Sequence, residues 1–393
     1  MPRITRSGIA AAWLLTPAVL AAVVCLIVPL AMFLVRGVSN AEIVNALPRT
    51  LTSLTAWNGE GLPPDEVYAD LASDLRHAAG SGSLGELARR MNFMVPGYRT
   101  LVMKTGTQLK GDVPEPRPAL ISIDKRWGEP EVWQLLRLES GRWTDSYFLA
   151  ALDRKRSADG DVVTVQPDQR IFVDLFIRTF VISVSVTVLC LLLGYPAAYL
   201  LALAPRRWLG VLLVLLLLPF WTSTLVRSTA WIVLLQNEGL INRILQGIGI
   251  VDAPLPLFAN RFAVLVAMTH VLLPYMIMPL YGAMKAVPPD LVRAAGSLGA
   301  NPVRAFFRVY LPQTYAGIAA GGLVVFILAL GFYVTPALVG GPRDQMVSYF
   351  IALYTNESLN WGLASALGTL LLSATALFYV VFSRFARVGA EAR

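Results

Sequence analysis

The sequence predicts an all-α membrane protein with six transmembrane helices and a mainly helical insertion between the first and second of them. Three observations predict it. The mean hydropathy is +0.60, which is high for a globular protein. Six apolar runs are long enough to cross a bilayer. The acidic residues are also concentrated, because 18 of the 25 lie between Glu42 and Asp168.

A helix needs about 20 apolar residues to cross the hydrocarbon core. The six runs that satisfy this length are residues 13–35, 172–204, 208–235, 262–284, 313–338 and 361–383. The first is too long for a signal peptide and lacks a small-residue cleavage site, so we interpret it as a retained anchor.

Basic residues in the short loops predict the orientation. With the N-terminus inside, most of them lie on the cytoplasmic side: Arg3, Arg6, Arg206, Arg207, Lys285, Arg293, Arg304, Arg308, Arg384, Arg387 and Arg393. Both termini are then cytoplasmic, and the net charge of +8 is a topology signal that requires no nucleic-acid partner. The expected division is a tail and first span (1–37), a periplasmic insertion (38–170), a five-helix core (171–383) with a cytoplasmic loop (285–312), and a tail (384–393).

Helical spacing indicates that the insertion is mainly helical. In LPPDEVYADLASDLRHA the prolines and acidic residues suit a helix start. Val67, Leu71 and Leu75 then follow at four-residue spacing. The stretches SLGELARRMNFM and EPEVWQLLRLE are similar. KTG (104–106) and SIDK (122–125) imitate two penicillin-binding motifs, but they stand in the wrong order, so we favour a docking domain over an enzyme.

The sequence lacks the features of an ATPase or a metalloprotein. There is no Walker A sequence, and no cytoplasmic loop could hold a nucleotide-binding domain. The only histidines, His77 and His270, are far apart, and Cys25 and Cys190 both lie in apolar runs. We therefore expect no catalytic residue, no metal and no bound cofactor. The last three spans also contain no Asp or Glu, which argues against an ion-driven carrier.

One cytoplasmic stretch is too polar to span a membrane: RAAGSLGANPVRAFFRVYLP, residues 293–312. Pro288 and Pro289 suit a helix start, and Asp290 falls in the first turn. One shallow apolar face follows at helical spacing, made of Leu291, Ala294, Ala295 and Leu298. Gly299 suits the left-handed position that ends a helix, and Asn301 can cap a second helix.

A short helix of this kind suits a groove in another protein, where it would transmit motion. The alternative is an amphipathic elbow that lies on lipid headgroups. Periodicity alone leaves both open.

The stretch resembles the EAA loop of ABC importer permeases, whose pattern is E-A-A, three residues, G, nine residues, I-x-L-P. The residues that fit it at the right spacings are Ala294, Ala295, Gly299, Val309, Leu311 and Pro312. The C-terminal half is similar to the spermidine/putrescine-type permeases, often grouped with opine permeases. Five segments support this: LPFWTSTLVRS (218–228), LINRILQGIGIVDAPLPLF (240–258), HVLLPYMIMPLYGAM (270–284), LGFYVTPALVGGP (330–342) and NWGLASALGTLLL (360–372).

The resemblance implies a bundle of the type I ABC importer kind in a bacterial inner membrane. It also implies a cytoplasmic ATPase dimer that uses ATP-Mg, a second permease subunit in a heterodimer, and a periplasmic solute-binding protein. The solute would be small and nitrogen-containing. The ATPase-coupling residues would be Asp290, Leu291, Arg293, Ala294, Ala295, Leu298, Gly299, Ala300, Arg304 and Pro312. Arg293 stands where the family has glutamate, so we hypothesise a compensating acidic residue on the ATPase.

Several aromatic and basic residues could line a path for a cationic solute. They are Trp221, Arg227, Trp231, His270, Tyr275 and Tyr333. Trp and Tyr also gather at membrane interfaces, and an arginine can be a structural anchor, so those alternatives stay open. Two rival functions are an ATP-independent secondary transporter and a membrane-anchored periplasmic enzyme or sensor.

Overall fold

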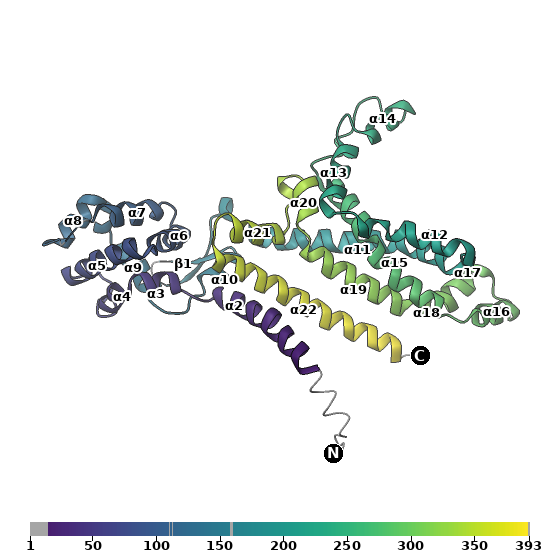
Figure 1. Cartoon of the computed structure of the whole chain (residues 1–393), viewed down its shortest axis with the longest axis horizontal. Coiled ribbons are helices and arrows are strands. Elements are labelled where there is room, and N and C mark those ends of the chain that lie inside the picture. The colour runs from purple at the N-terminus through teal and green to yellow at the C-terminus, as the bar shows by residue number, and fades with distance from the viewer. Residues whose placement is uncertain (1–14, 110, 112, 158–159, 392–393) are drawn as a thin grey trace, which may run out of the picture. The chain divides into compact units, whose positions relative to one another are not determined.

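A computed structural model describes residues 15–109, 111, 113–157 and 160–391 (Figure 1). Arg3, Arg6, Trp13 and Arg393 lie outside the described residues, as does the side chain of Arg387. The chain forms two compact units. Unit 1 is Met1–Arg170 with Leu353–Thr369, and unit 2 is Ile171–Ala352 with Leu370–Arg393.

Unit 1 holds the first apolar helix, eight short helices and one hairpin. The apolar helix is Leu15–Arg36, and its last nine residues are α2 (Val28–Arg36). The short helices are α3 (Ala41–Ala46), α4 (Pro48–Leu54), α5 (Asp65–Ser81), α6 (Leu84–Met94), α7 (Tyr98–Gln108), α8 (Pro116–Ile123), α9 (Pro130–Leu138) and α10 (Ser146–Ala151). Strands β1 (Arg154–Arg156) and β2 (Val162–Thr164) pair antiparallel. The long helix α22 (Trp361–Glu391) begins in this unit.

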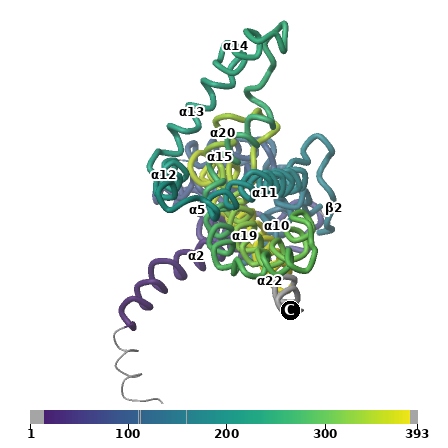
Figure 2. Tube along the Cα trace, turned by 90° about the vertical axis from the view of Figure 1, so that its right-hand side faces the viewer, coloured from purple at the N-terminus to yellow at the C-terminus, as the bar shows by residue number. Residues whose placement is uncertain are grey.

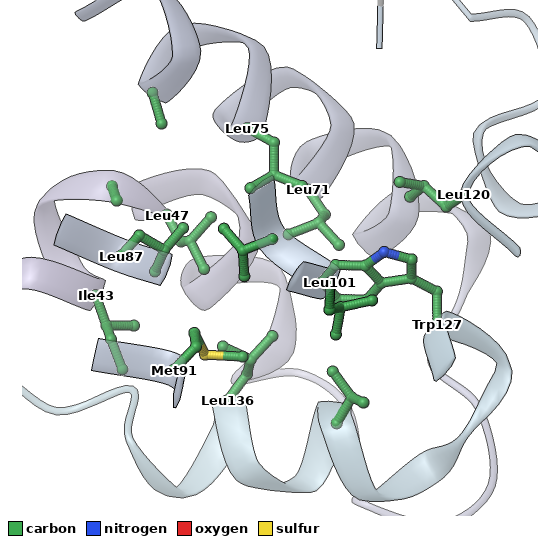
Figure 3. Close-up of a cluster of buried hydrophobic side chains, with 14 of the residues drawn as sticks. Ile43, Leu47, Leu71, Leu75, Leu87, Met91, Leu101, Leu120, Trp127 and Leu136 are labelled. Atoms are coloured by element: carbon green, nitrogen blue, oxygen red, sulfur yellow. The ribbon is translucent and has the colours of Figure 1, made fainter. Parts of the chain in front are cut away.

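The three helices predicted in the insertion are confirmed as α5, α6 and α9. Val67, Leu71 and Leu75 are at most 2% exposed, as their four-residue spacing predicts. Leu71 and Leu75 lie in a core that gathers leucines from several of the short helices around Trp127 (Figure 3). The β1–β2 hairpin was not predicted, because its strands are only three residues long and none of their residues is buried.

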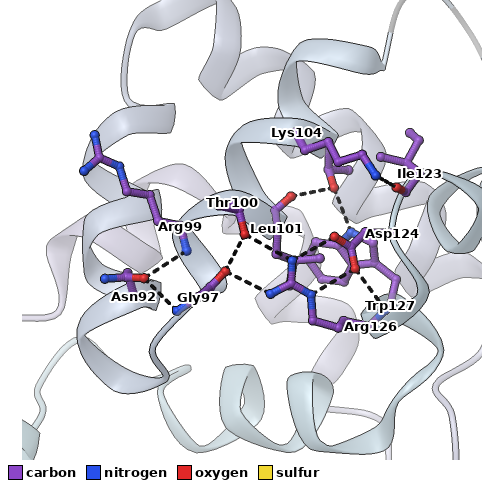
Figure 4. A network of polar contacts seen from close by, with 11 residues as sticks. Asn92, Gly97, Arg99, Thr100, Leu101, Lys104, Ile123, Asp124, Arg126 and Trp127 are labelled. Carbon is purple, nitrogen blue, oxygen red and sulfur yellow. Dashed lines mark hydrogen bonds and ion pairs between the residues drawn. The ribbon is translucent and has the colours of Figure 1, made fainter.

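The centre of this core is aromatic and its polar atoms are paired. The rings of Tyr68 and Trp133 lie 4.6 Å apart, and both side chains donate to the backbone carbonyl of Trp127. The Trp127 indole N–H donates to Thr105 Oγ1 at 2.9 Å. Thr105 of the KTG stretch is therefore a buried core residue, while Lys104 donates to the carbonyl of Ile123 (Figure 4).

A second polar network fixes α7 against the turn after α8 (Figure 4). Arg126 donates to both carboxylate oxygens of Asp124, at 2.9 and 2.8 Å, and to the carbonyl of Gly97 at 2.9 Å. Gly97 has φ +94°, so glycine suits this turn before α7. The hydrogen bonds from Arg126 lower the pKa of the Asp124 carboxyl.

Unit 2 is built on three long helices. Helix α15 (Arg261–Lys285) packs against α11 (Phe172–Leu203) and α19 (Tyr315–Gly331). The other elements are α12 (Arg206–Leu217), α13 (Thr224–Leu235), α14 (Leu240–Gly247), α16 (Pro289–Ser297), α17 (Pro302–Ala305), α18 (Leu311–Gln313), α20 (Val334–Val339) and α21 (Val347–Asn356), of which α21 ends in unit 1. In both views α13 and α14 leave the three-helix core (Figures 1 and 2).

Small residues bring α19 close to α15. A Cβ at Gly317 would lie 2.6 Å from the Ala283 Cβ, and one at Gly321 would lie 3.0 Å from the Met276 carbonyl oxygen. Larger side chains at these two positions would push the helices apart.

Among the described residues, four helices are long and apolar enough to cross a membrane, and two bent helix pairs raise the number to as many as six. The third expected span, 208–235, is not one straight helix. It breaks after Trp221, and the two parts meet at 96°. Pro219 lacks a backbone N–H, and Ser223 starts a new helix by accepting the N–H of Leu225.

The fifth expected span, 313–338, is shorter than predicted. Helix α19 ends at Gly331, and the remaining residues turn into the separate helix α20. At its start α19 meets the Pro302–Gln313 segment at 60°. A uniformly apolar run carries no signal for either boundary, because periodicity disappears when every position is apolar.

Candidate functional site

Helix α16 and the turn after it form as the sequence predicts. Pro289 occupies the first turn and Asp290 follows it. The backbone N–H of Ala300 donates to the Ala295 carbonyl, and that of Gly299 donates to the Gly296 carbonyl. Gly299 has φ +85°, so this is the Schellman ending that glycine favours.

The surface of α16 is open, because none of its residues is buried. On the predicted apolar face Leu291 is 41% exposed and Leu298 is 88% exposed. Ala294 is also exposed, whereas Ala295 is partly covered. The described residues of this chain therefore leave this face largely uncovered.

The second half of the loop begins at a capped helix. Asn301 Oδ1 accepts the backbone N–H of Arg304 at 2.8 Å, and Pro302 stands at the first turn of α17. A π-helical turn, Phe306–Tyr310, follows α17 and precedes α18, in which Pro312 lies. Arg304 is exposed and Ala300 is partly covered.

Four rings fasten this half of the loop to α11. We call them the aromatic anchor: Tyr195, Tyr199, Phe306 and Tyr310. Tyr199 contacts Phe306 and Tyr310 edge-on, with ring centroids 5.7 and 5.3 Å apart. The Tyr195 hydroxyl lies 3.1 Å from Thr314 Oγ1. Sequence reasoning missed the anchor, although the two tyrosines stand four residues apart near the end of an apolar run.

Arg293, the residue that replaces the family glutamate, forms an ion pair with Asp290 one turn earlier in α16. The two side chains are 75% and 83% exposed. Because exposed pairs contribute little to stability, the Arg293 guanidinium is free to exchange this partner for another.

The structure brings four of the six candidate path residues near one another, because Trp231 contacts His270, and Arg227 is close enough to His270 and Tyr275 for electrostatic interaction. Trp231 on α13 donates its indole N–H to His270 Nδ1 on α15 at 3.3 Å. Tyr275 packs against Phe220, with ring centroids 4.8 Å apart. Trp221 is 87% exposed beside the break in the third run.

The two other candidates lie on α13 and before α20. Arg227 donates to Thr224 one turn earlier, and its Nε has no hydrogen-bond partner among the described residues. Tyr333 is 43% exposed in the break between α19 and α20. Sequence reasoning missed the buried hydroxyl pair Ser228–Thr335, 3.0 Å apart, which joins α13 to α20.

Comparison with known proteins places this half of the chain in a family. Residues 191–389 match the model of the binding-protein-dependent transport system inner membrane component. The spermidine/putrescine transport system permease protein PotB of Haemophilus influenzae is 35% identical over 226 residues, which cover 56% of this chain and 79% of PotB. PotB of Escherichia coli is 31% identical over 218 residues, with the same coverages.

Among solved structures, an inward-facing form of the MetNI methionine ABC transporter is similar with a TM-score of 0.46 and 16% identity. The overlap covers 57% of this chain and 99% of that one.

The family match extends over half of the chain and includes α16 and the aromatic anchor. The chain therefore belongs to the inner membrane components of binding-protein-dependent transport systems, and it is a multi-pass permease subunit of an ABC importer.

Proposed function

We propose that this permease moves a small, cationic, nitrogen-containing solute into the cytoplasm and is driven by a separate ATPase that docks on α16. The observation that carries the proposal is the open apolar face of Leu291, Ala294 and Leu298. Exposed leucines on a short helix cost free energy in water, roughly 25 cal/mol per Å² of apolar surface, and a groove in a partner would remove that cost.

The aromatic anchor gives this contact a route into the membrane bundle. When the ATPase moves α16, the rings of Phe306 and Tyr310 press on Tyr199 of α11. A packed aromatic cluster transmits such a displacement because protein interiors are dense and resist compression. ATP and Mg²⁺ would be bound by two copies of the ATPase and by no residue of this chain.

The remaining partners follow from membership of the family. A periplasmic solute-binding protein delivers the solute, and a second, different permease chain completes the pore. Both termini and the loop 285–312 face the cytoplasm, and the insertion 38–170 faces the periplasm. The basic residues of the short loops support this orientation.

The class of solute rests on the relatives, which are named spermidine/putrescine permeases. Trp231 and Tyr275 offer aromatic faces for cation–π contact with such a solute. Arg227, which lies one turn from Trp231, would repel a cation, so we assign it to the support of α13 and not to the solute site.

Uptake into proteoliposomes tests the proposal. The complete transporter is reconstituted with its binding protein, and labelled spermidine is supplied outside. We expect uptake only when ATP is present on the side of the ATPase. Uptake at an equal rate without ATP would contradict the proposal and indicate a secondary transporter. If spermidine-loaded binding protein does not stimulate ATP hydrolysis, the proposed class of solute is wrong.

A further inference from the structure

Two membrane helices each have one end in unit 1. Helix α2 leaves the first span at Arg36, and α22 begins the sixth at Trp361. Both ends belong to the same compact unit as α3–α10. The insertion is therefore packed with the ends of two spans far apart in the sequence.

The ends of α2 and α22 contact each other directly. The Ser365 hydroxyl donates to the backbone carbonyl of Phe33 and lies 3.3 Å from that of Leu34. A Cβ at Gly37 would lie 2.8 Å from Ser365 Oγ. Glycine at position 37 allows this approach of the two backbones.

A buried arginine ties the insertion to the end of α2. Arg90 of α6 donates to Asn40 Oδ1 at 3.2 Å, to Glu139 at 2.8 Å and to Ser146 Oγ at 2.8 Å. Asn40 follows Gly37 by three residues and donates to the Glu139 carbonyl. The Arg90 side chain is 1% exposed and that of Glu139 is 9% exposed.

A tyrosine ties the same arginine to the start of α22. The Arg90 guanidinium lies 4.4 Å from the centre of the Tyr147 ring. The same ring covers Gly362, because a Cβ there would lie 2.2 Å from Tyr147 Cζ. Arg90 and Tyr147 thus contact, in turn, the segment after the first span and the first turn of the sixth.

A buried ion pair adds little net stability, because the cost of desolvating the two charges offsets their attraction. Apolar residues of equal volume would stabilise the fold as much. What such a pair supplies is one defined arrangement of the groups around it. Here those groups are Asn40, Ser146 and Tyr147, which stand beside the two span ends.

We propose that Arg90 and Tyr147 are positioning residues for transport. They hold the insertion to the outer ends of α2 and α22, so that these three parts move as one rigid body during the transport cycle. The inference rests on the proposed function, because it assigns the rigid body a place in the transport cycle.

A reversible cross-link tests the rigid body. Gly37→Cys and Ser365→Cys are combined after Cys25→Ala and Cys190→Ala, since the distance from the Gly37 Cβ position to Ser365 Oγ suits a disulfide. The complete transporter is assayed for uptake in proteoliposomes, first reduced and then oxidised. We expect the oxidised protein to retain uptake within about twofold, because a rigid body undergoes no internal change.

A loss of about tenfold or more on oxidation, restored by reductant, would overturn the proposal, because it would mean that the span ends must separate. Each single-cysteine protein under the same oxidant is the control. If the reduced protein shows no ATP-driven uptake, the proposed function fails, and the rate of cross-linking still tests the positioning role.

The rate of disulfide formation measures the role of Arg90. We expect Arg90→Met with Glu139→Gln, which removes both charges together, to slow cross-linking by about fivefold or more, because the span ends lose their fixed arrangement. Arg117→Met is the matched control. Arg117 pairs with Asp65 at 3.1 Å and lies 4.9 Å from the Tyr68 ring, far from Asn40 in the sequence. An unchanged rate in the Arg90 variant would contradict the proposal.

A variant in α22 tests the proposal independently if the Arg90→Met, Glu139→Gln protein fails to fold. Gly362→Ala would force Tyr147 aside, and we expect it to slow cross-linking in the same way. Tyr147→Ala alone, which removes the ring that covers Gly362, should also slow cross-linking. Gly80→Ala in α5, where a Cβ would meet nothing within 4 Å, should have no effect. An unchanged cross-linking rate in Tyr147→Ala would contradict a positioning role for Tyr147.

Discussion

The insertion and the loop 285–312 use the same sequence pattern and end in opposite environments. Helices α5 and α16 both begin with proline and an acidic first turn, and both carry an apolar face at helical spacing. In α5 that face is buried in a core around Trp127, whereas in α16 no residue is buried. Periodicity predicts an apolar face, but it does not tell whether the covering surface comes from the same chain.

Their ion pairs differ in the same way. Arg90 and Glu139 are nearly inaccessible and share further hydrogen bonds with neighbouring groups. Arg293 and Asp290 are mostly exposed. A buried pair fixes one arrangement, while an exposed pair is screened and exchangeable. The insertion therefore covers its own apolar face, and we propose that a partner covers the apolar face of α16.

The largest effect should come from the insertion core. Trp133→Ala removes a fully buried ring that contacts Tyr68 and Trp127, and we expect a loss of about 3–5 kcal/mol in the stability of the insertion. Hydrogen–deuterium exchange of α5 and α9 in the full chain would measure it. Leu298→Ala is the control and should leave exchange there unchanged. Unchanged protection in Trp133→Ala would mean that the insertion does not depend on its own core.

The next largest effect should be on association. Leu298→Asp puts a charge on the open face of α16, and we expect the affinity for the ATPase to fall about thirtyfold, or about 2 kcal/mol, as for a central interface residue. Protein stability should change by less than about 0.5 kcal/mol, because Leu298 is 88% exposed. Biolayer interferometry against the purified ATPase would measure the affinity. If the variant is stable and binds the ATPase with full affinity, α16 is not part of the ATPase interface.

A smaller effect is expected at the aromatic anchor. Tyr199→Leu keeps an apolar side chain but removes two ring contacts, each worth about 0.5–1.5 kcal/mol. The ATPase should still bind, while uptake per ATP hydrolysed falls, because the loop is loosened from α11. Paired uptake and hydrolysis assays would show it. Loss of binding and uptake in equal proportion would contradict a transmission role.

The polar network of the insertion should give a pH-dependent effect. The Arg126 hydrogen bonds lower the pKa of Asp124 in the folded state, so the carboxylate stabilises the fold above the unfolded pKa of about 3.9 and loses that contribution as pH falls below it. Asp124→Asn should therefore destabilise the insertion by about 1 kcal/mol at pH 7. The difference from the unchanged protein should shrink in acid, and a difference that grew in acid would show that another carboxyl controls it.

The smallest effect on stability is expected at Arg293. Arg293→Glu places two acids three residues apart in α16, which costs less than about 0.5 kcal/mol at an exposed site. If an acidic residue of the ATPase receives Arg293, affinity for the ATPase should fall several-fold and depend less on salt. Unchanged association and uptake would disprove the compensation hypothesis.

The parts of the fold that local chemistry decides were predictable. Gly299 and Asn301 define the boundaries of α16 and α17 because a left-handed turn and a helix cap each need particular residues. The break after Trp221 and the end of α19 at Gly331 were missed, since apolar runs look alike whether straight or bent. Arg90 could not have been predicted as buried, because its partners Asn40 and Glu139 lie about 50 residues away on either side.

The mass of the intact complex tests directly whether two ATPase copies bind this chain through α16. A tagged copy of the chain is extracted gently from its native membrane and weighed by native mass spectrometry, beside the Leu298→Asp variant. We expect two ATPase copies with the unchanged chain, together with a second permease, and the loss of both ATPases from the variant. A chain free of any ATPase in several mild detergents, or a variant that keeps both copies, would contradict it.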